Sequence, residues 1–217
     1  MPAEIATIKG LWNIFSQPIF LYNSIEYRCI RIATLCWFVS VYQEEFRMVS
    51  IRLVKSQEAE LAMEIINAGK RYLKAQGVDQ WQTGYPALDD IQQDIVEEKG
   101  YFLTVDGEVS GYVCIDFGGE PAYSTLEGKW ATPEQYAVIH RLAFSDKARG
   151  KGLADTAFRL AEKVALQHGV TAVRVDTDNE NKKMKHLLAK NGFTYRGSVW
   201  YDNSIKIAYD KIIPGKA

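Results

Sequence analysis

Four consecutive residues, Arg149-Gly150-Lys151-Gly152, carry the strongest chemical signal in the chain. They follow an apolar run, residues 137–144, and precede a segment with the three- and four-residue apolar spacing of a helix. The first turn of a helix offers unpaired N–H groups and partial positive charge, and glycines let a phosphate approach the backbone. The two basic side chains add full charge. The segment therefore predicts a pyrophosphate site.

The elements around this turn indicate one α/β domain. Upstream, the pattern predicts a strand over 49–54, a helix between Ser56 and Gly77, a second helix from about 89 to 99, and a hairpin around Asp106-Gly107. Residues 118–135 are expected to be a long irregular loop. Downstream, the spacing predicts a helix over 153–168, strands from 172 and 193, and a short helix over 182–190.

Three segments together resemble the GNAT superfamily of N-acetyltransferases: LAFSDKARGKGLA (142–154), DTDNENKKM (176–184) and LLAKNGF (187–193). Their order and spacing match the family. The resemblance implies a GNAT fold, in which helices flank a mixed, largely antiparallel sheet whose fourth and fifth strands splay apart. It also implies that acetyl-coenzyme A is the acetyl donor.

The resemblance implies where the donor binds: pyrophosphate on 149–154, the pantetheine arm along the backbone of 142–144, and Asn181 against the arm. Lys147 stands where the family usually has Gln or Arg, a change that keeps the charge but not the planar guanidinium. The expected cofactor-binding residues are Leu142, Ala143, Phe144, Lys147, Arg149, Gly150, Lys151, Gly152, Leu153, Ala154 and Asn181.

His140 is the candidate catalytic base. An amine acceptor must lose a proton near pH 7, and histidine suits that task. Regular alternation along the strand would place His140 on one face with Leu142 and Phe144. The alternative is a buried histidine with a structural role beside Arg141.

Leu188 stands where many family members carry the Tyr that protonates the departing thiolate. The thiolate then leaves as the anion, which a thiol pKa near 8.5 tolerates, or takes a proton from another group. Tyr195 and Tyr201 are the candidates for such a group. The same substitution supports an alternative function, an acyl-coenzyme A sensor with little turnover. A third interpretation treats the glycine turn as a nucleotide-phosphate site.

The expected reaction is acetyl transfer to a primary amine by direct attack, with backbone N–H groups near residues 142–144 stabilising the oxyanion. Trp81 and Tyr85 are expected to form the wall of the acceptor pocket, or else to anchor their loop on the core. The acceptor itself stays open among small amines, amino acids, antibiotics, peptide N-termini and protein lysines. No metal is needed.

Composition narrows the setting. The 217 residues carry a net charge of −1, which argues against nucleic acid as a partner. Three cysteines, Cys29, Cys36 and Cys114, show neither even pairing nor zinc-ligand spacing, so a reducing cytoplasm is expected. The apolar stretch 29–42 is short for a membrane span and contains an arginine. No membrane association is expected, and monomer and homodimer stay open.

The domain is expected to comprise residues 48–217, because the enzyme-like pattern begins at Met48. Residues 1–47 are rich in aromatic residues but have no clear period. They are interpreted as an N-terminal extension outside the catalytic domain, with a partner-binding or membrane-surface segment as the alternative.

Overall fold

The computed structural model describes residues 47–201 and 204–214, and all of these except Arg47 belong to a compact unit beginning at Met48. The expected extension, residues 1–47, lies outside the described residues except for Arg47, and so do Cys29 and Cys36. The assignment of the extension therefore stays a prediction.

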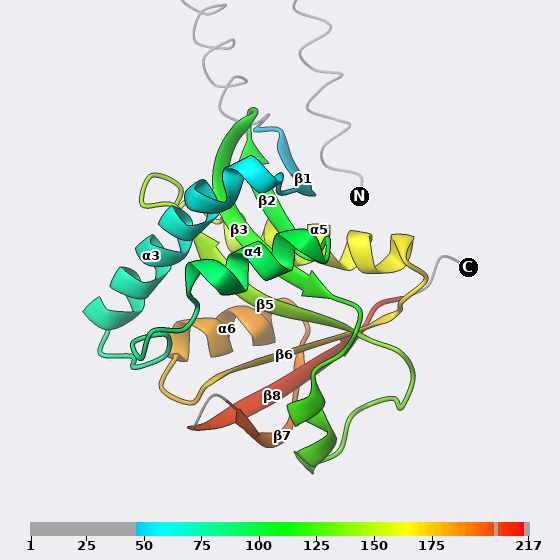
Figure 1. Cartoon of the computed structure of the whole chain (residues 1–217). Coiled ribbons are helices and arrows are strands. Elements are labelled where there is room, and N and C mark those ends of the chain that lie inside the picture. Colours follow the sequence, from blue (N-terminus) through cyan, green and yellow to red (C-terminus); the bar gives the residue numbers. More distant parts are fainter. Residues whose placement is uncertain (1–46, 202–203, 215–217) are drawn as a thin grey trace, which may run out of the picture. The chain divides into compact units, whose positions relative to one another are not determined.

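One eight-stranded sheet forms the centre of the described unit (Figure 1). The strand order is β1-β2-β3-β5-β6-β8-β7-β4, and every neighbouring pair is antiparallel except β5 with β6. The predicted mixed, largely antiparallel sheet is confirmed. The strands are β1 (Val49–Leu53), β2 (Gly100–Val105), β3 (Glu108–Asp116), β4 (Glu127–Gly128), β5 (Ala137–Phe144), β6 (Ala172–Asp178), β7 (Thr194–Tyr201) and β8 (Ser204–Ile212).

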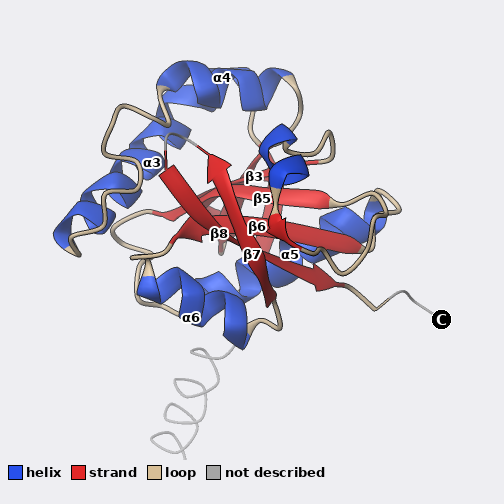
Figure 2. Cartoon of the chain, turned by 90° about the horizontal axis from the view of Figure 1, so that it is seen from below, coloured by secondary structure: helices blue, strands red, loops and turns tan. Residues whose placement is uncertain are grey.

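Helices cover both faces of this sheet (Figures 1 and 2). One face carries α3 (Ala59–Ala75), which continues the 3-10 turn η1 (Ser56–Glu58), and α4 (Leu88–Val96). The other face carries α5 (Leu153–Gln167) and α6 (Lys182–Lys190).

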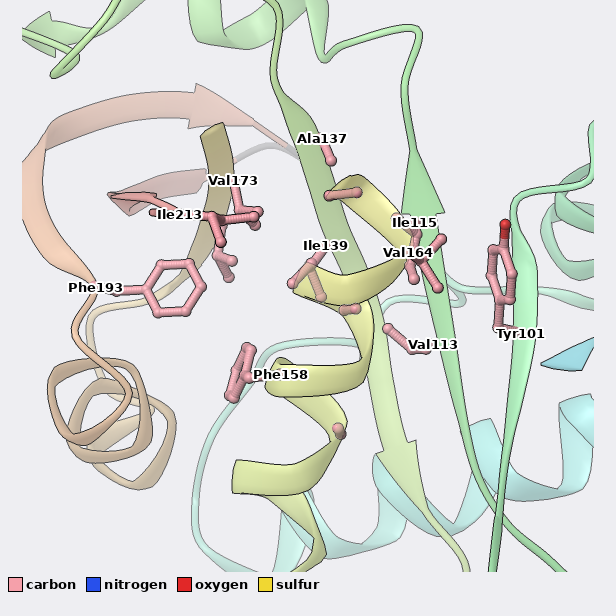
Figure 3. Close-up of a cluster of buried hydrophobic side chains, with 14 of the residues drawn as sticks. Tyr101, Val113, Ile115, Ala137, Ile139, Phe158, Val164, Val173, Phe193 and Ile213 are labelled. Atoms are coloured by element: carbon pink, nitrogen blue, oxygen red, sulfur yellow. The ribbon is translucent and has the colours of Figure 1, made fainter. Parts of the chain in front are cut away.

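The helix α5 packs its apolar stripe against the middle strands. Phe158 of α5 meets Phe193 with ring centroids 5.3 Å apart, and both lie beside Ile139 and Val173 (Figure 3). Leu188 of α6 is fully buried in the same cluster. This core holds α5 against the middle of the sheet, and the glycine turn lies between the end of β5 and the start of α5.

The two parallel strands separate soon after they meet. Only Ala137 pairs with Val173 and Val138 with Arg174 before β5 and β6 diverge. The predicted splay is therefore confirmed. From Ile139 onward, the edge of β5 that faces β6 is not paired with that strand, which leaves backbone groups for a ligand.

A β-bulge interrupts β5. Tyr112 lies opposite Ala143 and Cys114 opposite His140, so β5 has one residue more than β3 in this interval, and Arg141 adopts a φ of 54°. The expectation that His140 shares a face with Leu142 and Phe144 is wrong. The extra residue reverses the alternation: His140 lies on the face of Cys114, toward α3 and α4, and the other two pack against the α5 cluster.

The segment 118–135 is more ordered than expected. It contains the 3-10 turn η2 (Pro121–Thr125) and the short strand β4. Tyr123 of η2 packs with Val138, Val199 and Ala208 in a small separate cluster. This packing holds η2 against the sheet beside the opening between β5 and β6.

Candidate active site

The glycine turn has the geometry of an anion site. Gly150 and Gly152 have φ values of 78° and 73°, a region that side-chain-bearing residues rarely adopt, and Gly152 is the N-cap of α5. A Cβ built on either glycine would meet no atom within 4 Å, so the space above the turn is open. The first N–H groups of α5 lack helical partners. The turn therefore fits a pyrophosphate.

Arg149 holds the turn in place. Its guanidinium donates to the carbonyl oxygens of Ala68 in α3 (3.0 Å) and Phe144 in β5 (3.2 Å), and to Asp146 (2.6 Å). It also lies 4.4 Å from the centre of the Tyr72 ring. These contacts join α3, β5 and the turn, so much of the donor capacity of Arg149 is committed within the protein.

One cavity of about 320 Å³ runs from this turn along the splayed edge of β5. Nine of the eleven predicted cofactor-binding residues line it; the exceptions, Lys147 and Lys151, are exposed at the surface. His140, Trp81 and Tyr85 line the cavity as well. The cavity size is that of a small-ligand site.

Asn181 has two roles in the structure. Its Oδ1 accepts from the N–H of Met184 at 3.1 Å, which caps α6, and its Nδ2 donates to Oε1 of Gln80 at 3.0 Å. The same Gln80 oxygen accepts from the hydroxyl of Thr177 at 3.3 Å. The loop after α3 is thus tied to the start of α6 at the wall of the cavity.

Trp81 and Tyr85 both anchor their loop and form the cavity wall. A Cβ on Gly69 would lie 3.1 Å from the Trp81 ring and 3.2 Å from Ala143, so glycine permits this close packing of the loop, α3 and β5. The ring of Tyr85 lies 5.3 Å from the Arg141 guanidinium. Burial raises the pKa of Tyr85 to about 12, so its phenol keeps its proton at neutral pH.

A buried ion pair supports the bulge beneath Tyr85. Nη1 of Arg141 donates to both carboxylate oxygens of Asp94 in α4, at 2.9 and 3.0 Å. The hydroxyl of Tyr112 adds a third bond at 2.6 Å. This network joins α4 to β3 and β5 and neutralises the charge of Arg141 at the cavity wall.

His140 lies at the far end of the cavity, with Nε2 3.7 Å from Oε2 of Glu120. Burial, together with the charge of Arg141, lowers the pKa of His140 to about 3. The imidazole is therefore neutral at pH 7 and a much weaker base than a free histidine.

Three residues at this end were not predicted as site residues: Asp176, Glu120 and Lys206. Asp176 lines the cavity and accepts from the hydroxyl of Tyr123 at 2.7 Å, and Lys206, also in the wall, is paired with Asp178. Asp176 opens the second family-like segment, so its position was visible in the sequence. Glu120 lies in a segment with no recognisable period.

Leu188, at the position of the family's general-acid tyrosine, does not line the cavity. Leu188 faces the core, whereas Met184 and Leu187 of the same helix line the cavity. Of the two alternative tyrosines, Tyr201 lines the cavity and burial raises its pKa, whereas Tyr195 is 56% exposed and lies outside it.

Comparisons with known proteins agree with this geometry. Residues 66–193 match the sequence model described as the acetyltransferase (GNAT) family. A GNAT-family acetyltransferase structure from Streptococcus agalactiae is 34% identical, with a TM-score of 0.70, and the match covers 76% of this chain and 96% of that one.

The chain belongs to the GNAT acetyltransferase family. The predicted acetyl donor, acetyl-coenzyme A, is confirmed as the donor of the family. At the level of fold alone, the chain also resembles an aminoglycoside acetyltransferase in complex with coenzyme A, at 20% identity and a TM-score of 0.56, over 76% of this chain and 95% of that one.

Streptothricin acetyltransferase of Escherichia coli is 27% identical over 125 residues, or 58% of this chain. The match spans 62% of the length of that relative. Among the described residues of this GNAT chain, no helix is both long and apolar enough to cross a membrane.

Proposed function

We propose that this GNAT protein transfers an acetyl group from acetyl-coenzyme A to a primary amine by direct attack. The observation that carries the proposal is the continuous cavity, which joins an open glycine turn at the start of α5 to a polar end lined by His140 and Asp176. A donor bound along β5 would present its thioester at that end. Holding the two reactants together would supply much of the rate enhancement.

The cofactor roles follow from the same cavity. Backbone N–H groups of Gly150, Gly152 and the first turn of α5 would bind the pyrophosphate, and the unpaired edge of β5 would bind the pantetheine amides. The N–H groups at the bulge would stabilise the oxyanion. Lys147 and Lys151 would act only through their charge, because both are exposed outside the cavity.

The acceptor side is proposed to consist of Trp81, Tyr85 and His140. The aromatic rings would enclose the acceptor chain, and His140, held neutral by its lowered pKa, would accept a hydrogen bond from the amine. Tyr201 would stand near the leaving thiolate in place of the family tyrosine, since it lines the cavity with its proton retained. The buried, reduced thiol of Cys114 accords with a cytoplasmic enzyme.

Two measurements on one preparation test the function. Coenzyme A affinity is measured by calorimetry, and thiol release from acetyl-coenzyme A is followed with streptothricin, kanamycin, 1,4-diaminobutane, lysine amide and a lysine peptide. Binding together with amine-dependent thiol release is expected. Binding without release for any amine would instead support an acyl-coenzyme A sensor. ATP binding that coenzyme A does not displace would support a nucleotide site.

A further inference from the structure

We propose that Asp176 binds the ammonium group of the acceptor and takes its proton. This inference rests on the proposed acetyltransferase function and deepens it, because it also selects acceptors that carry positive charge. Asp176 lines the cavity where β5 and β6 diverge, forms no ion pair with a cation of the described part of the chain, and is more basic than His140.

The position follows from the strand register. Val138 pairs with Arg174 at the last parallel step between β5 and β6. Two residues further along each strand, His140 and Asp176 come level across the opening, and both line the cavity. Asp176 is thus a carboxylate at the point where the strands diverge, beside the expected position of the thioester.

The charges around Asp176 leave it without a cation partner. Its Oδ1 accepts from Tyr123, and Oδ2 has no hydrogen-bond partner within 47–201 and 204–214. Lys206, whose positive charge acts on Asp176, is itself paired with Asp178. The groups that face Asp176 are Tyr123 and Glu120 from the η2 segment, Asp178 on its own strand, Lys206 from β8, Tyr201 from β7 and His140 from β5.

Glu120 adds a second negative charge at this end. Its nearest basic group is His140, which is neutral at pH 7 because of its lowered pKa. Arg141, another basic residue in the cavity wall, is committed to Asp94. The acceptor end of the cavity therefore has one carboxylate in its wall, Asp176, and a second, Glu120, beside His140. Neither of them forms an ion pair with a lysine or arginine among the described residues. Such a site favours an acceptor with one or more ammonium groups and disfavours a carboxylate next to the reacting amine.

The basicity of Asp176 suits a proton acceptor. Burial raises its pKa to about 6, and the negative charges of Glu120 and Asp178 act in the same direction, whereas Tyr123 and Lys206 oppose it. A base works best when its pKa lies near the working pH. Asp176 is ionised at pH 7 yet holds a proton far better than His140, whose pKa is lowered to about 3.

The acceptor R–NH3+ gives one proton to the Asp176 carboxylate, and the freed lone pair attacks the thioester carbon. The C–N bond forms and the C–S bond breaks. The second proton from nitrogen passes to the leaving sulfur, and the products are the amide and the free thiol. Asp176 then releases its proton to solvent.

Asp176→Asn tests the proposal, because asparagine keeps the size of the side chain and an oxygen for Tyr123. The matched control is Glu162→Gln, a buried carboxylate on α5 paired with Lys211, outside the cavity. At pH 7 we expect kcat/KM for 1,4-diaminobutane and kanamycin to fall about 100-fold or more in Asp176→Asn, as for loss of a general base. The loss should shrink toward pH 9.5, where more of the amine is free. Coenzyme A affinity should be unchanged.

Other results would overturn the inference. An Asp176→Asn pH–rate profile that overlays the parent profile would remove Asp176 from the reaction. The same conclusion would follow if high pH restored the activity of His140→Ala but not that of Asp176→Asn. An independent measurement uses the unmodified protein: carbon NMR of labelled Asp should show the pKa of Asp176 falling when 1,4-diaminobutane binds, and no change would contradict the proposal. If the parent protein turns over none of the amines, the proposed function itself fails.

Discussion

At the scale of single residues, the acceptor end of the cavity contains a carboxylate that opposes folding. Asp176 has its pKa raised from 3.8 to about 6, so the folded state binds its proton more tightly than the unfolded chain does. The destabilisation is absent below pH 4, grows between pH 4 and 6, and is complete above pH 6. Such a group is retained for chemistry more readily than for stability.

The first prediction concerns stability against pH. At pH 7, Asp176→Asn should raise the free energy of unfolding by about 2–3 kcal/mol, because each pKa unit corresponds to about 1.4 kcal/mol and the charge is removed. Near pH 3.5 the gain should vanish. Urea unfolding at both pH values measures this. A variant that is less stable than the parent protein at pH 7 would show that the carboxylate is structural.

The second prediction separates the two roles of Asn181. Asn181→Ala should lose the helix cap, about 1 kcal/mol of stability, and also weaken coenzyme A binding. Asn181→Asp keeps an oxygen for the Met184 N–H but removes the Nδ2 donor, so it should retain the helix cap and still lose coenzyme A affinity. Melting temperature and calorimetry on both variants check this. Equal coenzyme A affinity in all three proteins would leave Asn181 as a cap alone.

At the scale of elements, the glycine turn and the start of α5 act as one unit. The backbone of Gly150 and Gly152 is left-handed, and the space above them is open. A side chain there would therefore strain the backbone and fill the space that a phosphate needs, without striking protein atoms.

The third prediction is that Gly150→Val and Gly152→Val each weaken coenzyme A binding at least tenfold. Each should also cost about 1–2 kcal/mol of stability, because a β-branched residue is strained at positive φ. Gly77→Val is the control: its φ is 69°, nothing lies within 4 Å of its Cβ, and it is outside the cavity. It should lose similar stability and no affinity. Unchanged calorimetric affinity in both turn variants would refute the anion site.

At the scale of the whole molecule, every residue assigned here to the cofactor and acceptor sites lies within the unit that begins at Met48. The fourth prediction is that a chain starting at Met48 binds coenzyme A within about threefold of the full chain, a difference below 1 kcal/mol. Turnover with the best amine should be retained as well. A large loss of coenzyme A affinity on truncation would assign residues 1–47 to the working enzyme.

The cofactor half of the site could be predicted from local sequence. Gly150 and Gly152 act through backbone conformation, and the helix that starts at Leu153 acts through its own unpaired N–H groups, so a short stretch of chain carries the whole signal. The sheet, its helices and the splay followed from periodicity and from the family resemblance. These features depend on neighbours in the sequence.

The acceptor half was decided by tertiary structure. The bulge at Arg141 turned His140 to the opposite face from Leu142, and no alternation rule predicts one extra residue in a strand. The charge of Glu120 acts on Asp176 only because η2 packs on the sheet, and burial there moved the pKa values of His140 and Asp176 in opposite directions. Charge pairing and desolvation depend on residues distant in the chain, so only the folded protein determines which group holds the proton.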